Sequence, residues 1–152
     1  MKAIGIKMVD LQSMTANEAI EKGYKTNNYT GEEKGYEVTY PDGYKSWSPK
    51  AVADKAYFKL ADEHGETIKQ EDIERFIAKE SVTTDGSKNT VVTLTTITGF
   101  EANCISSCIK PENYDANINI GKKFARPHAV DQIRAGLEFV LQWAKYGLTF
   151  NE

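Results

Sequence analysis

The sequence predicts an α+β fold made of two small modules, β-α-β-β-α over residues 1–62 and α-β-β-β-α over residues 66–152. The turn Pro41-Asp42-Gly43, placed between strand-forming residues, is typical of a β-hairpin. Thr-rich segments separated by Asp-Gly and Thr-Gly turns indicate an antiparallel meander. Apolar residues that recur with a helical period from Pro127 to Tyr146 indicate a long C-terminal helix.

The first module begins with a strand that we expect over Ala3–Leu11, followed by a short helix. Thr15 and Glu18 have the spacing of a capping box, in which each residue satisfies a backbone N–H of the other. Gly23 then ends the helix, because glycine readily adopts the left-handed conformation found just after helix ends.

The hairpin strands of the first module are expected over Tyr36–Tyr40 and Tyr44–Trp47. A second helix follows, with Ser48 as its N-cap and Pro49 as its first residue. The apolar face of this helix comprises Val52, Ala53, Ala56, Tyr57 and Leu60.

The second module opens with a helix that we expect to be capped by Thr67 and to bury one apolar face. That face comprises Ile68, Ile73, Phe76 and Ile77. The three strands of the meander are expected over Ala78–Thr84, Thr90–Thr98 and Phe100–Ile109.

The last helix is expected to start near Pro111 with Asp115 as a cap, and Pro127 should kink or divide it because proline lacks an N–H. Its apolar stripe comprises Ile133, Leu137, Val140, Leu141, Ala144 and Leu148. On the opposite side lie Phe139, Trp143 and Tyr146, which we interpret as a homo-oligomer interface or as a docking face for the first module.

Composition excludes several classes of protein. The net charge of -3 argues against bulk binding of nucleic acid through a basic surface. The longest uncharged run, Asn89–Phe100, is rich in Thr and too short to span a membrane. Cys104 and Cys108 would lie ~13 Å apart on one strand, too far for a disulfide. We therefore expect free thiols in a reducing compartment.

No catalytic or metal-binding template fits the sequence. His64 and His128 are the two imidazoles; His64 reads as a solvated linker residue. His128 could pair with Cys108 or Cys104, although buried structural thiols explain the cysteines as well. The spacing of His and Cys does not match a zinc site, and Gly121-Lys122-Lys123 lacks the rest of a phosphate loop. We expect a non-enzymatic protein without a metal or other cofactor.

Two groups of residues suggest a binding site. Residues 116–130 carry Lys122, Lys123 and Arg126 but no acid, and Asn113 and Tyr114 stand just before them. Cations near a helix start favour an anion such as phosphate, although a solvated helix face that balances charge elsewhere explains the same pattern.

The second group is aromatic and lies in the hairpin. Tyr44 and Trp47 could stack on a base or anchor a partner protein, whereas core packing is the alternative explanation for the hairpin aromatics. The complete set of candidate ligand-binding residues is Lys122, Lys123, Arg126, His128, Asn113, Tyr114, Tyr44 and Trp47.

The order of motifs in the C-terminal part is not generic. It runs from Thr98-Gly99-Phe100 through Ser106-Ser107-Cys108 and Pro111-Glu112-Asn113-Tyr114-Asp115 to Ile120-Gly121-Lys122-Lys123. This stretch resembles a family of tailed-phage and prophage proteins named after gene products forty-nine and sixty-six. The resemblance covers roughly residues 70–145.

The run Gly35–Lys50 also resembles a module of prophage accessory proteins, in which it is fused to varied domains. Some of those domains look like counter-defence proteins that sequester immune nucleotide signals or inhibit CRISPR nucleases. The resemblance implies a phage accessory protein in the host cytoplasm that sequesters a nucleotide-derived immune signal. The alternative is a protein–protein inhibitor of a host defence component such as a CRISPR nuclease.

Overall fold

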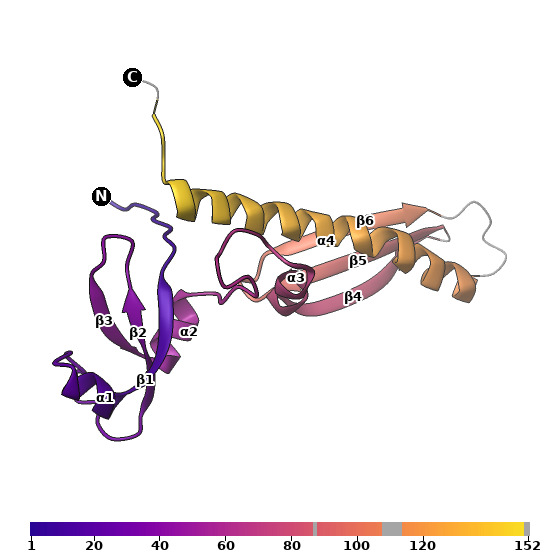
Figure 1. The fold of residues 1–152 in the computed structure, drawn as a ribbon. Helices are drawn as coiled ribbons and strands as arrows, with labels where there is room; N and C mark the ends of the chain where they lie inside the picture. Colours follow the sequence, from indigo (N-terminus) through magenta and orange to yellow (C-terminus); the bar gives the residue numbers. More distant parts are fainter. Residues whose placement is uncertain (87, 108–113, 151–152) are drawn as a thin grey trace. The chain divides into compact units, whose positions relative to one another are not determined.

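The computed structural model describes residues 1–86, 88–107 and 114–150. These residues form two three-stranded antiparallel sheets and four helices, which confirms the predicted α+β fold (Figure 1). The elements are β1 (Asp10–Thr15), α1 (Ala16–Glu21), β2 (Lys34–Thr39), β3 (Lys45–Pro49), α2 (Lys50–Ala56), α3 (Gln70–Phe76), β4 (Ile77–Asp85), β5 (Asn89–Thr96), β6 (Glu101–Ser107) and α4 (Tyr114–Tyr146).

The chain divides into two compact units. Unit 1 comprises Met1–Lys59 with Gln142–Glu152, and unit 2 comprises Leu60–Leu141. The element order agrees with the two predicted modules, whereas their boundaries as independently folding domains, 1–62 and 66–152, stay a prediction.

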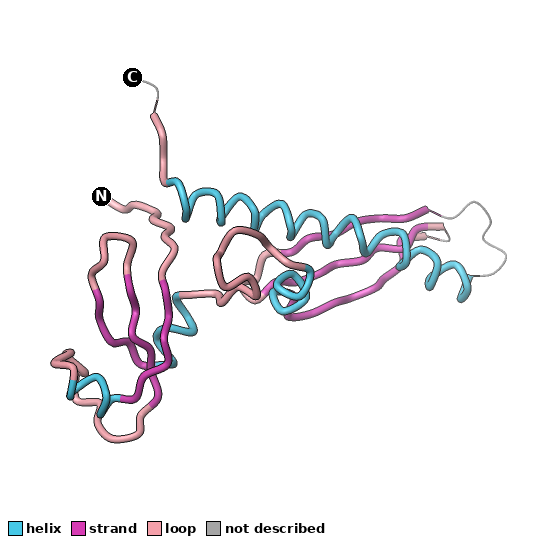
Figure 2. The backbone as a smooth tube through the Cα atoms, in the orientation of Figure 1, coloured by secondary structure: helices cyan, strands magenta, loops and turns pink. Residues whose placement is uncertain are grey.

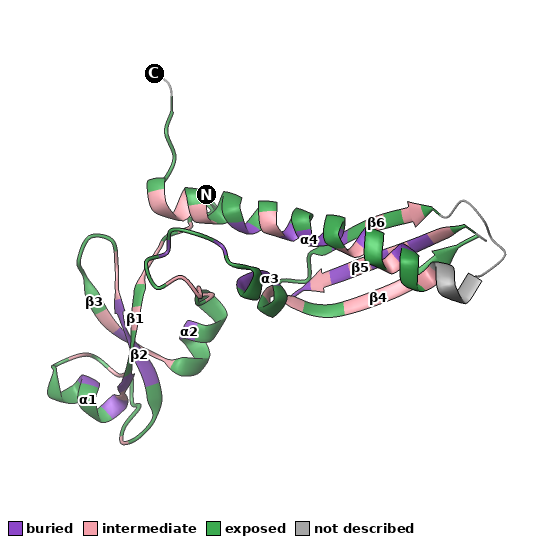
Figure 3. Ribbon diagram, turned by 45° about the vertical axis from the view of Figure 1, so that its right-hand side comes forward, coloured by how far each residue is buried: buried purple, intermediate pink, exposed green. Residues whose placement is uncertain are grey.

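Unit 1 is built on the sheet β1-β2-β3, which carries a helix on each face. Because side chains alternate along a strand, Trp47 faces the opposite side of the sheet from Tyr36 and Val38. Trp47 packs with α1 in one cluster of buried residues, and Tyr36 and Val38 pack with Ala53 of α2 in another. Figure 3 shows buried residues on these strands and on both helices.

The capping box and the hairpin turn of unit 1 are confirmed. Thr15 N–H donates to Glu18 Oε2 at 2.7 Å, and Glu18 N–H donates to Thr15 Oγ1 at 3.3 Å. In the turn, Tyr40 N–H donates to the Tyr44 carbonyl at 2.9 Å, and Gly43 has a φ of 84°. Glycine is required at this position, because L side chains rarely adopt such a φ.

Two predictions for unit 1 are wrong. The first strand begins at Asp10 rather than Ala3, because Asp10 pairs with Thr39, the last residue of β2, and the partner strand ends there. The second helix starts at Lys50, after Pro49, and has no side-chain cap, so Ser48 belongs to β3. This helix ends at Ala56, so that within it only Ala53 of the predicted apolar face is buried.

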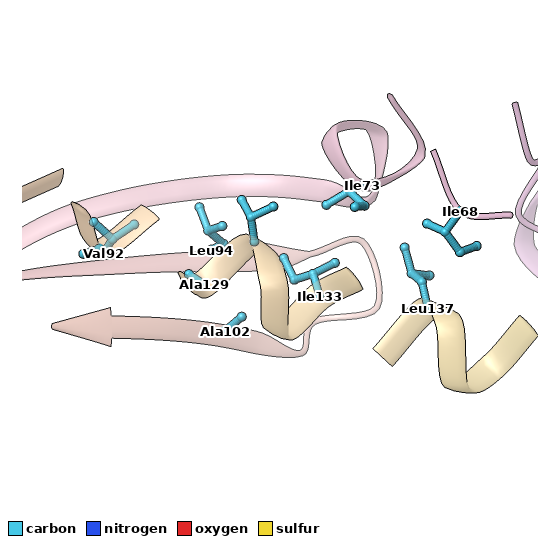
Figure 4. Close-up of a cluster of buried hydrophobic side chains, with 10 residues drawn as sticks. Ile68, Ile73, Val92, Leu94, Ala102, Ala129, Ile133 and Leu137 are labelled. Carbon is cyan, nitrogen blue, oxygen red and sulfur yellow. The ribbon is translucent and has the colours of Figure 1, made fainter. Parts of the chain in front are cut away.

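Unit 2 is built on the sheet β4-β5-β6, with a single core between the sheet and the helices α3 and α4. Along β5 every second residue is buried, as expected of a strand with one face in a core. Figure 4 shows side chains of β5, β6, α3 and α4 meeting in this core. The buried residues are Ile68, Ile73, Val92, Leu94, Ala102, Ala125, Ala129, Val130, Ile133 and Leu137.

Among the described glycines of unit 2, Gly121 is the one at which α4 lies closest to the sheet. An ideal Cβ at Gly121 would lie 2.3 Å from Oγ1 and 2.5 Å from Cβ of Thr90, a buried residue of β5. No side chain larger than glycine fits there without moving the helix, so this glycine serves helix–sheet packing.

The long helix departs from the sequence prediction in two ways. It continues through Pro127 without interruption (Figure 2), so the predicted division is wrong. Ala125 and Ala129 are buried against the sheet on either side of the exposed Pro127, and this packing holds both halves in place. Asp115 lies inside the helix rather than at its cap, and Pro111 and Ile109 lie outside the described residues.

The predicted apolar stripe of α4 is confirmed at three of its positions. Ile133 and Leu137 are buried and Leu141 packs against the core. Val140 is exposed, and Leu148 is exposed and follows the helix end at Tyr146.

A buried carboxylate determines the start of α3. Asp72 is fully buried and accepts hydrogen bonds from Lys69 N–H at 2.9 Å and Ala61 N–H at 2.8 Å, while Arg75 pairs with it at 2.6 Å. The helix therefore starts after Lys69, and the predicted cap at Thr67 is wrong: its hydroxyl donates to Asp62 instead, at 3.0 Å. A carboxylate accepts a hydrogen bond from a backbone N–H more strongly than a hydroxyl does. This difference explains why Asp72, rather than the hydroxyl of Thr67, determines where the helix starts.

Candidate functional site

The acid-free stretch of α4 meets its counter-charges on other elements of unit 2. Lys122 Nζ lies 2.6 Å from Glu80 Oε1. Arg126 donates from Nε to Glu80 at 2.8 Å and from NH2 to Glu74 at 2.9 Å. The cluster of Lys122, Arg126, Glu74 and Glu80 thus balances two cations with two carboxylates and ties α4 to α3 and β4.

Contacts within this cluster shift the pKa values of its charged side chains. Hydrogen bonds from Lys122 and then Arg126 lower the pKa of Glu80, and hydrogen bonds from Arg126 lower the pKa of Glu74. The same two carboxylates raise the pKa of Arg126. Both acids are therefore ionised at neutral pH, and an anion at Lys122 or Arg126 has to compete with them.

The other predicted phosphate-site residues fall into two groups. Lys123 and His128 are exposed on α4. Tyr114 is the first residue of α4, while Asn113 and Cys108 lie outside the described residues. The role of these residues in binding an anion stays a prediction, and so does a contact of His128 with either cysteine.

Trp47 is a core residue of unit 1, which corrects the prediction that it is available for stacking. Its side chain is only 7% exposed, and its Nε1–H donates to the Met14 carbonyl at 3.0 Å. The indole lies over Gly35, where an added Cβ would come within 2.5 Å of the ring, and Tyr29 packs on it with ring centres 5.7 Å apart. Core packing therefore explains this aromatic residue.

Tyr44 has the opposite environment. It is 65% exposed at the hairpin turn, and its ring centre lies 5.8 Å from that of Tyr40. Together with Lys7, Pro41 and Asp42, these rings line an open hollow of about 500 Å³. Lys7 Nζ lies 4.6 Å from the centre of the Tyr40 ring, a cation–π contact.

Tyr40, which lines this hollow, also contacts other polar side chains through its hydroxyl. The hydroxyls of Ser46 and Tyr57, together with the charge of Lys7, lower the pKa of Tyr40. Burial and the contact with Tyr40 raise the pKa of Tyr57 to about 12. Lys7 was not predicted as a site residue, because residues 3–11 were expected to form a strand.

The second side of the C-terminal helix divides between exposed and half-buried residues. Phe139 and Tyr146 are exposed, whereas Trp143 is half-buried. Further towards the start of α4, Ile120 and Phe124 are 51% and 63% exposed. This second pair was not predicted from the sequence, because two apolar residues within one helical turn are a weak periodic signal.

The predicted stacking residues and the predicted phosphate residues belong to different units. Tyr44 and Trp47 lie in unit 1, whereas Lys122, Lys123 and Arg126 lie in unit 2. The two groups are therefore separate candidate sites, one in each unit.

Within the described ranges, no three His, Cys, Asp or Glu side chains come together as ligands of a metal ion. The helices of the described chain include none that is long and apolar enough to cross a membrane.

Comparison with protein families matches residues 49–144 to the phage protein (N4 Gp49/phage Sf6 gene 66) family. The match starts at Pro49 and covers the whole of unit 2. No curated protein and no solved structure matches the chain.

Proposed function

The chain belongs to this family of phage proteins, and on that premise we propose that it is a non-enzymatic accessory protein that counters host defence by binding. Its place of action would be the host cytoplasm. Gly35–Lys50, most of which precedes the matched range, would be part of a module that prophage accessory proteins share.

The observation that carries the proposal is the exposed apolar pair on α4. Ile120 and Phe124 are four residues apart, so they lie on one side of the helix. The exposed Lys123 adjoins them. Because these two side chains are already about half covered (51% and 63% exposed), burial of the rest contributes about 2–3 kcal/mol to a complex, before the costs of association. A partner with an apolar groove and an acidic rim would fit this surface.

This chemistry favours a protein partner, and the proposed activity is inhibition of a defence component such as a CRISPR nuclease. Self-association through Phe139, Trp143 and Tyr146 would add a second copy of the surface and increase avidity.

The second candidate function is sequestration of a small nucleotide-derived immune signal, with Lys122, Lys123 and Arg126 as phosphate contacts. Lys122 and Arg126 would have to exchange carboxylate partners for the phosphate. Lys123 is exposed on the same helix, so its contact with phosphate would disturb the least structure. Asn113, Tyr114 and His128 would complete this site.

The test compares Phe124→Ala with Phe100→Ala, a matched control because both side chains are 63% exposed in unit 2. Tagged proteins are purified from host cells that carry a defence system, and phage plating on those cells is measured. We expect the wild type and Phe100→Ala to raise plating and to retain a partner that re-forms a complex with the purified chain on gel filtration. Phe124→Ala should lose both properties.

Native mass spectrometry of the same preparations separates the two candidates. A nucleotide-sized mass that Lys123→Glu removes and Phe124→Ala retains, with plating affected in the same way, would overturn the docking proposal. Lys123→Glu is more informative than Lys122→Glu with Arg126→Glu, because the double variant breaks the ion pairs with Glu74 and Glu80.

A further inference from the structure

The hairpin tip of unit 1 combines an exposed aromatic face with a cation and an acid. Tyr44 presents its ring to solvent beside Tyr40, and Lys7 lies over the Tyr40 ring. Asp42 completes the rim of the hollow. Stacking surface, positive charge and a hydrogen-bond acceptor therefore occur together around one shallow, open hollow of about 500 Å³.

The backbone of the turn holds these groups in place. Tyr40 N–H bonds to the Tyr44 carbonyl at 2.9 Å, and Gly43 N–H bonds to the Tyr40 carbonyl at 2.9 Å. Asp42 Oδ1 accepts Tyr44 N–H at 3.0 Å, which leaves Asp42 Oδ2 as an acceptor. Because these bonds order the turn without a ligand, binding here loses little backbone entropy.

We propose that this hollow binds a planar anion of the mononucleotide class, with its base on Tyr44, its phosphate at Lys7 and an exocyclic amine at Asp42. Every base has a π-face that stacks on an aromatic ring, and the lysine supplies the charge that the phosphate needs. Lys7 Nζ lies 4.6 Å from the Tyr40 ring centre, which is 5.8 Å from that of Tyr44, so one mononucleotide can reach both groups.

The hollow is independent of the docking surface on α4. Its lining residues, which run from Lys7 to Tyr44, all precede Pro49, where the family match begins. It would supply a small-anion site that needs none of Lys122, Lys123 or Arg126. A failure of this inference leaves the docking proposal intact, and the reverse also holds.

The experiment is an NMR titration of the full ¹⁵N-labelled chain with adenosine monophosphate. One stacked base and one surface ion contact correspond to a dissociation constant on the order of 1 mM. We expect shifts at the amides of the turn residues. Tyr44→Ala should weaken binding by about tenfold or more, and Lys7→Glu should weaken it and reverse its salt dependence.

A matched control lies in the same unit. Lys25 is an exposed lysine that does not line the hollow. Lys25→Glu should bind the nucleotide as the wild type does. Phe124→Ala should also bind it normally, while Tyr44→Ala should keep the protein partner of α4.

Three further ligands test each part of the assignment. Adenosine should bind more weakly than its monophosphate, and equal affinity would overturn the role of Lys7. Inorganic phosphate should leave the Tyr44 amide unshifted. A short oligoadenylate should bind no more tightly per nucleotide than the monophosphate; tighter binding would overturn a mononucleotide site in favour of a single-strand site. Unchanged affinity in Tyr44→Ala would overturn the proposal as a whole.

Discussion

Replacement of Gly121 by alanine should destabilise unit 2, although alanine is the better helix former. The added Cβ would lie 2.3 Å from Thr90 Oγ1 and 2.5 Å from Thr90 Cβ, whereas ordinary contacts begin near 3.4 Å. Thr90 is buried, β-branched and on the central strand, so it cannot turn away. The helix must therefore move outward by about 1 Å, at the cost typical of an overpacked core.

The magnitude follows from two opposing contributions. Overpacking costs about 1–3 kcal/mol, and the higher helix propensity of alanine returns at most about 1 kcal/mol. We expect a net loss of about 1–2 kcal/mol, which lowers the thermal midpoint of a unit this size by roughly 4–16 °C. Gly136 offers a matched control on the same helix, because an added Cβ there meets nothing within 4 Å.

The assay is thermal and urea unfolding followed by circular dichroism at the helical band, to which α4 is the largest contributor among the described helices. Gly136→Ala should stabilise the protein by up to about 1 kcal/mol, and Gly121→Ala should do the opposite. If both variants gain stability by similar amounts, the close approach of α4 to Thr90 is not a feature of the protein.

Two further predictions concern the packing of unit 1 and the ion pairs of unit 2. Gly35→Ala should place a Cβ within 2.5 Å of the Trp47 ring. We expect the free energy of unfolding to fall by about 1–3 kcal/mol and the tryptophan emission to shift to the red. An unchanged emission spectrum would contradict this packing. Glu80→Gln should cost about 1 kcal/mol at pH 7, measured by urea unfolding, and less at pH 3. The direction of this pH dependence follows from the lowered pKa of Glu80. Its contacts with Lys122 and Arg126 stabilise the fold fully above the unfolded pKa, and this stabilisation is lost as the pH falls through the lower folded pKa. An equal cost of the substitution at both pH values would argue against these ion pairs.

Local signals in the sequence were reliable where the responsible groups lie close together in the chain. The capping box of Thr15 and Glu18 and the turn around Gly43 are confirmed, because each depends on residues within a few positions. The cap of α3 was wrong for the opposite reason. Asp72 is fixed partly by Ala61 N–H, eleven residues away, and no local pattern reports such a contact.

The candidate site shows the same limit. An acid-free stretch of sequence suggested unpaired cations, yet Arg126 meets Glu74 and Glu80 from elements about fifty residues earlier. The first strand also depends on a distant partner, because its start at Asp10 is set by the end of β2. Burial of Trp47 likewise required knowledge of where Met14 lies. Charge balance and aromatic exposure are properties of the assembled unit.

Pro127 also affects the backbone of α4. Proline has no N–H, so the carbonyl of Lys123, four residues earlier, loses its donor within the helix. Lys123 and Phe124 are both exposed at this turn. The helix thus carries, in the turn that holds Phe124, a carbonyl without its usual helical donor. A partner that docks on Phe124 would have an acceptor for one of its own donors. Such a contact would fix the partner's orientation, which apolar burial alone does not do.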